Sequence, residues 1–315
     1  MSNPSRGHAS LLSWVSLFAC NGMWALQFTC IKLVQDQVGP LATVWIPTLL
    51  STCLLCPILA RERRHTPALG TRPRFLPAVM VRLYLLLVLL GVVPGQLLMT
   101  IGTRYSLASN SAMITLALPV TTALFAVLFL HEKMTLTRWI SFALALCGVI
   151  LASAGTLSQV QINRNQLAGN LLVLLAILGS SFYNSYGKKA LDSHTPMEML
   201  FWTYLFLTLC LAPFVLAMEP ATFAHLAEFT ARTWTGLALL TFFHTFLAMV
   251  LFLKALHHLD AIQAALSNYL IPLFGIPIAA LFLGEHMTPA AIAGGVLILV
   301  STVLMAWLDH VRASA

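Results

Sequence analysis

Long apolar runs separated by short polar connections dominate this chain. Each run holds about 20 residues, the length that an α-helix needs to cross the hydrocarbon core of a bilayer, whereas a membrane-spanning strand needs only about ten. Ten such runs occur, at residues 11–34, 40–60, 80–102, 107–130, 137–155, 167–188, 196–218, 233–256, 261–283 and 289–308. Because backbone groups in lipid must be satisfied within the segment, runs of this length fold as helices. We therefore predict an all-α polytopic membrane protein with ten transmembrane helices.

Composition excludes a soluble globular protein of this size. Of 315 residues, 59% are hydrophobic and only 9% are charged, and the mean hydropathy is +0.87. Soluble domains carry about 25% charged residues. The connections between the runs are short, so the chain has no stretch that predicts a separate soluble domain.

The net charge of +7 could indicate a nucleic-acid-binding protein, but the basic residues lie in connections between apolar runs, as at Arg61, Arg63 and Arg64. That distribution orients a membrane protein. With both termini in the cytoplasm, 4 of the 17 Lys and Arg residues fall near the outer face, namely Lys32, Arg104, Arg164 and Arg232. We predict a multi-pass protein of the cell (inner, plasma) membrane with cytoplasmic N- and C-termini, surrounded by lipid bilayer, and no nucleic-acid partner.

The chain contains an internal repeat. "LFLHEKMT" at 128–135 and "LFLGEHMT" at 281–288 agree at six of eight positions. At the same offset of 153 residues, Pro119 aligns with Pro272. At a similar offset of 156 residues, Lys32 aligns with Lys188. Similarity at a fixed offset indicates repeated structural units. We predict two five-helix domains, 11–155 and 166–308.

An odd number of helices in each repeat inserts the second copy upside down. Lys32 and Lys188, and likewise Glu132 and Glu285, then lie at opposite faces of the membrane. Inverted repeats are typical of transporters that work by alternating access, with substrate bound between the repeats near the middle of the membrane.

Several motifs resemble those of one transporter family. They are a Trp-Ala-x-x-Phe-x-x-x-Lys run from Trp24 to Lys32, a mid-helix Pro in the fourth and ninth runs, and a Leu-Phe-Leu-x-Glu ending in both halves, each followed by a Gly-bearing helix (Gly148; Gly294, Gly295). With these features the chain resembles ten-helix transporters of the drug/metabolite transporter superfamily with paired EamA domains. It departs from the family pattern at Ala25, where Gly is usual, and at Ser180, which takes the place of a second Trp.

The resemblance implies a carrier of small metabolites, most often an exporter of amino acids or related compounds. An uptake carrier and a broad-range drug exporter are alternatives. The four-helix multidrug exporters of the superfamily use a membrane-buried Glu, and none of the apolar runs carries a carboxylate at mid-membrane depth. This argues against a cation-selective drug pump of that type.

Polar side chains at mid-membrane depth are costly in lipid and therefore mark candidate substrate contacts. The competing interpretation is that such groups only hydrogen-bond between helices. The substrate-binding candidates are Asn21, Trp24, Gln96, Thr115, Tyr183, Asn184, His244 and Asn268. We predict neither a metal site nor a cofactor.

His244 is the one histidine in the middle of an apolar run, and its side chain can titrate near neutral pH. Two hypotheses stand side by side: a role in proton coupling, and a neutral ring buried in the bundle.

Pro119 and Pro272 fall about halfway along their runs, where proline bends a helix. We predict that they act as hinges for gating. Glu132 and Glu285 each precede a Thr by three residues, and we interpret them as groups that end a span and cap the following helix.

Other classes of protein fit less well. His131-Glu132 begins a zinc-protease motif, but position 135 is Thr and not the second His. We predict no enzymatic activity. A receptor or scaffold without transport does not require inverted halves.

Overall fold

A computed structural model describes residues 4–65, 76–133 and 164–284, together with single positions between 135 and 147 and between 289 and 307. Every regular element in these ranges is helical. The first half contains α1 (Pro4–Val34), α2 (Pro40–His65), α4 (Ala78–Leu86), the π-helices η1 (Leu87–Val92) and η2 (Pro94–Leu98), α5 (Met99–Tyr105), α6 (Ala108–Ile114), the 3₁₀ turn η3 (Thr115–Ala117) and α7 (Leu118–Leu130).

The second half has corresponding long helices, with the short elements α10, α12 and η4 added between them. It contains α9 (Arg164–Tyr186), α10 (Lys188–Leu191), α11 (Pro196–Met218), α12 (Pro220–Ala224), the 3₁₀ turn η4 (Leu226–Glu228), α13 (Ala231–Leu239), the π-helix η5 (Leu240–Ala248), α14 (Met249–His258), α15 (Ala261–Ser267) and α16 (Leu270–Leu283).

Eight helical segments of the described chain are long and apolar enough to cross a membrane. They match eight of the ten predicted spans, so an all-α polytopic membrane protein is confirmed. The remaining two, 137–155 and 289–308, lie outside the described ranges except for single positions. Residues 219–232, predicted as a plain connection, carry α12 and η4.

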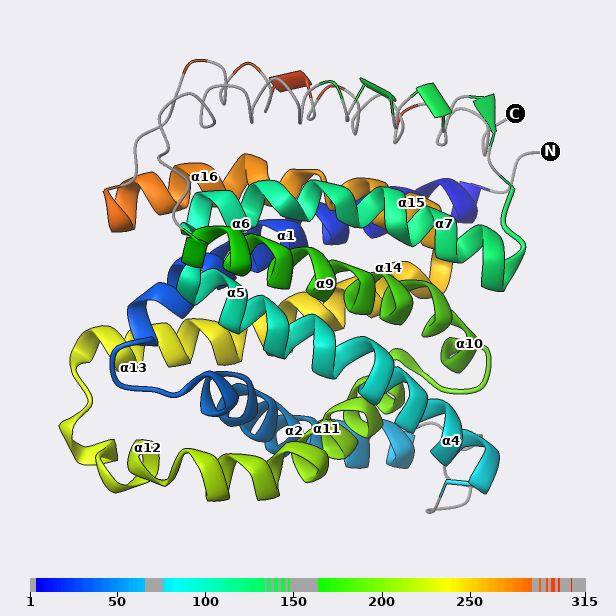
Figure 1. The fold of residues 1–315 in the computed structure, drawn as a ribbon. Coiled ribbons are helices and arrows are strands. Elements are labelled where there is room, and N and C mark those ends of the chain that lie inside the picture. Colours follow the sequence, from blue (N-terminus) through cyan, green and yellow to red (C-terminus); the bar gives the residue numbers. More distant parts are fainter. Residues whose placement is uncertain are drawn as a thin grey trace.

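The two halves run in opposite directions through the bundle. In Figure 1, α1 begins at the side where the chain starts, whereas α9 begins at the other side, and the end of α7 lies near the beginning of α15. We call the side with the end of α7, α10 and the start of α15 the N-terminal face, and the side with α12 the opposite face. The packing repeats accordingly: α1 contacts η5, α14 and α16, while α9 contacts η1, η2, α5 and α7.

The fourth and ninth spans are each interrupted in the middle. The 3₁₀ turn η3 separates α6 from α7, and a turn at Asn268 and Tyr269 separates α15 from α16. A proline ring clashes with the carbonyl of the fourth residue before it. That residue is Thr115 for Pro119 and Asn268 for Pro272, so each break lies where its proline forces it.

The octets end these two spans in the same backbone conformation. His131 follows α7 with a left-handed φ of 56°, and Gly284 follows α16 with a φ of 70°. A left-handed residue is a common way to end a helix. The aligned fourth letters of the octets are therefore matching helix ends.

Candidate functional site

A cavity of about 90 Å³ lies in the middle of the bundle, between the two halves. It is lined by α1, η1, η2, α5, η3 and α7 from the first half and by α9, α11, η5, α14 and α16 from the second. The lining residues are Trp24, Gln27, Phe28, Gly91, Val92, Gly95, Gln96, Met99, Thr115, Leu118, Ser180, Tyr183, Asn184, Tyr204, His244, Met249 and Ile271. About 10–15 Å³ holds one water, so this cavity can accommodate a small solute or several waters.

π-Helical turns form part of the wall in both halves. η1 and η2 in the third span and η5 in the eighth occupy matching places, and His244 lies within η5. π-Turns inside α-helices are frequent at functional sites. Pro94, which lacks a backbone N–H, begins η2 and contributes to the irregularity there.

Two glycines let the third span approach α9 closely. A Cβ on Gly91 would lie 3.0 Å from Cβ of Tyr183, and one on Gly95 would lie 2.8 Å from Oγ of Ser180. Both glycines also line the cavity. They bring the wall formed by η1 and η2 against the face of α9 that carries Tyr183.

The repeat places equivalent positions of the two halves on the same cavity. Trp24 and Ser180 are aligned in α1 and α9, as are Gln27 with Tyr183 and Phe28 with Asn184, and all six line it. The aligned residues differ in type at every pair. The cavity is therefore pseudo-symmetric in backbone and asymmetric in chemistry, with more aromatic surface from α1 and more hydrogen-bonding groups from α9.

The polar groups of the wall are neutral. Gln27 Nε2 donates to Gln96 Oε1 at 3.3 Å and joins α1 to η2. The hydroxyl of Tyr204 donates to the carbonyl of Thr245 at 2.6 Å. His244 is buried, and its Nδ1 has no hydrogen-bond partner among the described residues. A charge on this ring would have no counter-ion in the wall, since no lining residue is Asp, Glu, Lys or Arg.

Six of the eight predicted substrate-binding residues meet at this cavity: Trp24, Gln96, Thr115, Tyr183, Asn184 and His244. The other two do not line it. Asn21 is fully buried one turn away on α1, where its Nδ2 donates to Leu17 O at 2.7 Å and to Ser267 Oγ at 2.9 Å. Asn268 is fully buried at the break between α15 and α16. For Asn21 the structure shows the competing role, a hydrogen bond between helices.

Sequence reasoning missed several lining residues, among them Met99, Ser180, Tyr204, Met249 and Ile271. For two of these residues, alignment of the two halves could have indicated a position at the cavity. Ser180 is aligned with Trp24, and Ile271 is aligned with Leu118, which also lines the cavity. Apolar residues such as Met99 carry no signal of their own, because they are indistinguishable from residues that face lipid.

A smaller cavity of about 20 Å³ continues from the central one toward the opposite face. It shares Gln27, Gln96, Tyr204 and His244 with the central cavity and adds residues farther along the helices, such as Ile31 and Thr43. The central cavity therefore has a small, partly polar neighbour on that side.

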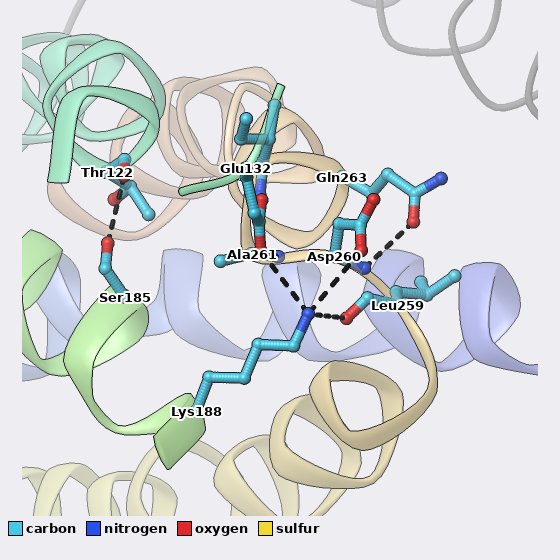
Figure 2. A network of polar contacts seen from close by, with 9 residues as sticks. Thr122, Glu132, Ser185, Lys188, Leu259, Asp260, Ala261 and Gln263 are labelled. Carbon is cyan, nitrogen blue, oxygen red and sulfur yellow. Dashed lines mark hydrogen bonds and ion pairs between the residues drawn. The ribbon is translucent and has the colours of Figure 1, made fainter. Parts of the chain in front are cut away.

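The N-terminal face is held by a polar network, shown in Figure 2. Glu132, just beyond α7, accepts hydrogen bonds from the backbone N–H groups of Ala261 at 2.9 Å and Ile262 at 3.1 Å. Lys188 lies 3.4 Å from Glu132 and 3.6 Å from Asp260, and it donates to the carbonyl of Leu259 at 3.0 Å. Three carboxylate and carbonyl partners thus surround one ammonium group.

This network shows where the Glu132 carboxylate binds. We expected it to cap the helix that follows it in the chain, and most of that helix lies outside the described residues. The carboxylate caps the N-terminus of α15, 129 residues away in the other half. The expected physical effect, a carboxylate at a positive helix end, is present, but it links the two halves. Glu285, the aligned residue, lies outside the described residues.

The described residues form no group of three or more His, Cys, Asp or Glu that could hold a metal ion.

One family model matches the sequence twice, and the two matches together cover most of it. The model of the EamA-like transporter family matches residues 12–154 and again residues 167–307. This chain belongs to the EamA-like transporter family. It is a multi-pass membrane transporter, as the eight apolar helices also indicate.

Relatives of similar length support the same assignment. An uncharacterized transporter from Archaeoglobus fulgidus is 21% identical over 91% of this chain and 95% of its own length. The uncharacterized transporter YvbV from Bacillus subtilis is 28% identical over 90% of this chain and 88% of its own. A solved crystal structure shares the fold with a TM-score of 0.69 and 13% identity, covering 98% of this chain and 99% of the other.

Proposed function

We propose that this transporter exports small metabolites, such as amino acids or their derivatives, by alternating access around the central cavity. The observation that carries the proposal is the position and chemistry of that cavity. It lies between two halves of opposite direction, where binding sites of inverted-repeat carriers are found.

The neutral wall favours a solute without net charge. A net charge in the cavity would lose its hydration without gaining a counter-ion, which is costly. Amides, hydroxyls and an imidazole can orient a polar solute, while Trp24, Phe28 and Met99 supply apolar and aromatic surface. Zwitterionic amino acids and their neutral derivatives meet both requirements, whereas a polycationic drug does not. We assign no catalytic role to any residue.

The proposed orientation in the membrane follows from charge. Basic residues gather at the ends of spans on the N-terminal face, including Arg61, Arg63 and Lys188. By the positive-inside rule this face is cytoplasmic, with both termini on the same side in the inner (plasma) membrane. Export is then movement from the N-terminal face toward the opposite face. Uptake by the same cavity is the alternative direction.

The test is solute flux in proteoliposomes loaded with a panel of labelled amino acids and neutral derivatives. The wild-type protein should carry at least one of them. Trp24→Ala should raise the half-saturating concentration about tenfold or more, because truncation of a buried Trp contact typically costs about 2 kcal/mol. Trp234→Ala, half exposed in α13 and away from the cavity, is the matched control and should behave as wild type. Absence of flux for the whole panel, or equal flux with Trp24→Ala, contradicts the proposal.

The same assay addresses coupling to protons. His244 lines the cavity and is the titratable side chain that a proton-coupled cycle would use. If protons are a partner, His244→Gln should flatten the pH dependence of flux between about pH 5.5 and 8. An unchanged pH profile assigns His244 to substrate contact alone.

A further inference from the structure

A third cavity lies at the N-terminal face and is separate from the central one. Its volume is about 390 Å³, and it is lined by residues of α1, α2, α11 and α14. We call it the vestibule. Its lining residues are Leu12, Ser13, Ser16, Glu62, Pro196, Met197, Lys254, Ala255, His257 and His258.

Three helices, α1, α11 and α14, contribute lining residues to both cavities. On α1 the central cavity is lined by Trp24 and the vestibule by Ser16, which lies about 12 Å away along the helix at 1.5 Å per residue. On α11 the residues are Tyr204 and Met197, about 10 Å apart, and on α14 they are Met249 and His257, about 12 Å apart. The distance between the two sets of lining residues is similar on all three helices. The vestibule therefore lies between the central cavity and the N-terminal face, along the axis of the bundle.

A closed layer separates the two cavities in this structure. The rings of Trp24 and Phe252 pack with their centroids 4.9 Å apart, and Phe252 is buried. Leu17 and Cys20 on α1 and Leu200 on α11 are also fully buried at this level. Trp24 therefore forms the floor of the central cavity and part of the layer beneath it.

The vestibule differs from the central cavity in chemistry because it carries charges of both signs. Lys254, His257 and His258 share one face of α14 through their i, i+3 and i, i+4 spacing. Glu62 on α2 also lines the vestibule, and one of its carboxylate oxygens is buried without a hydrogen-bond partner among the described residues. Burying a carboxylate oxygen without a partner is costly, which suits a site that receives a donor from a ligand.

We propose that the vestibule is a binding site for small zwitterionic metabolites on their way to the central cavity. The ligand's ammonium group would bind Glu62, and its carboxylate would bind Lys254. The Trp24–Phe252 layer then separates this first site from the central one. The inference rests on the proposed function, because it assigns the solute its place of arrival from the cytoplasm.

Cysteine labelling tests the vestibule without requiring transport. Ser16→Cys is made in a background in which the six native cysteines are replaced, and membrane vesicles of both orientations are treated with a charged, membrane-impermeant methanethiosulfonate. The matched control retains Cys20 as its only cysteine, one turn deeper on α1 and fully buried. Ser16→Cys should react from the N-terminal face, and Cys20 should not.

Three probes of the same shape then define the ligand class: L-leucine, 3-methylbutylamine and 4-methylpentanoate. Leucine at about ten times its Kd should slow labelling of Ser16→Cys about tenfold, and the two singly charged probes should protect less. Glu62→Gln and Lys254→Gln should each abolish protection by leucine. Lys189→Gln, which removes a charge at the same face but outside the vestibule, should preserve it.

Three results would overturn the proposal. The first is a Ser16→Cys thiol that reacts no faster than Cys20. The second is that all three probes slow the labelling of Ser16→Cys equally. The third is that leucine still slows this labelling in both Glu62→Gln and Lys254→Gln. Lys254 is exposed, so its variant keeps the test decisive even if Glu62→Gln fails to fold. Flux without protection would leave the proposed function intact and contradict the proposal that the vestibule binds the solute. Protection without flux would contradict the proposed function and leave the vestibule as a binding site for zwitterions without a role in transport.

Discussion

At the scale of single residues, His131 carries a strain that its repeat mate avoids. Both positions end a span in the left-handed region, but His131 has a Cβ and Gly284 does not. Left-handed backbone costs a non-glycine residue about 1–2 kcal/mol. His131→Gly should therefore raise the free energy of unfolding by about 1 kcal/mol and the Tm in detergent by about 2–4 °C. His131→Ala removes the imidazole but keeps Cβ, so it should give no such gain. An equal rise in both variants would show that the imidazole, and not the backbone, is the source of strain.

At the scale of elements, the two interrupted spans are the parts of the bundle best suited to bend. Each break lies four residues before a buried proline, and each adjoins the central cavity through Leu118 or Ile271. If the breaks are hinges, Pro119→Ala and Pro272→Ala should each lower the maximum rate of flux about tenfold, or about 1.4 kcal/mol on the barrier. Pro213→Ala is the control, because Pro213 lies inside α11 without interrupting it. Rates equal to wild type in both variants would leave the prolines without a hinge function.

The same elements show what sequence could and could not predict. The eight described spans were predictable to within a few residues because apolar length alone defines them, and the mid-helix prolines marked the breaks. The π-helical turns at the cavity were not predictable, since their residues have no distinct periodicity. The partner of Glu132 was also out of reach, because it depends on which distant helix end the fold brings beside α7.

At the scale of the whole molecule, the Glu132 network joins elements that the proposed alternating access would have to separate. It ties the end of α7 in the first half to the start of α15 in the second, with Lys188 from α10 between them, as Figure 2 shows. Just inside this network Ser185 on α9 donates to the carbonyl of Thr122 on α7 at 2.9 Å, and Thr122 is fully buried. The N-terminal face is thus closed here by charge-assisted bonds, with a packed layer beneath them.

Opening of this face requires those bonds to break, and their loss should shift the population toward the open state. Glu132→Gln weakens two charge-assisted hydrogen bonds to α15 and removes one of the two carboxylates beside Lys188, leaving Asp260. We expect this change to cost about 1–3 kcal/mol. Thr122→Cys in a cysteine-free background reports the opening, because a buried thiol reacts only when the face opens. Its labelling rate from the N-terminal face should rise about tenfold with Glu132→Gln, since about 1.4 kcal/mol is a tenfold change in population. Lys188→Gln should act in the same direction, while Glu228→Gln, which changes an exposed carboxylate at the opposite face, should not. If Glu132→Gln lowers the Tm but leaves the labelling rate unchanged, the network is a structural cap for α15 and some other set of contacts determines when this face opens.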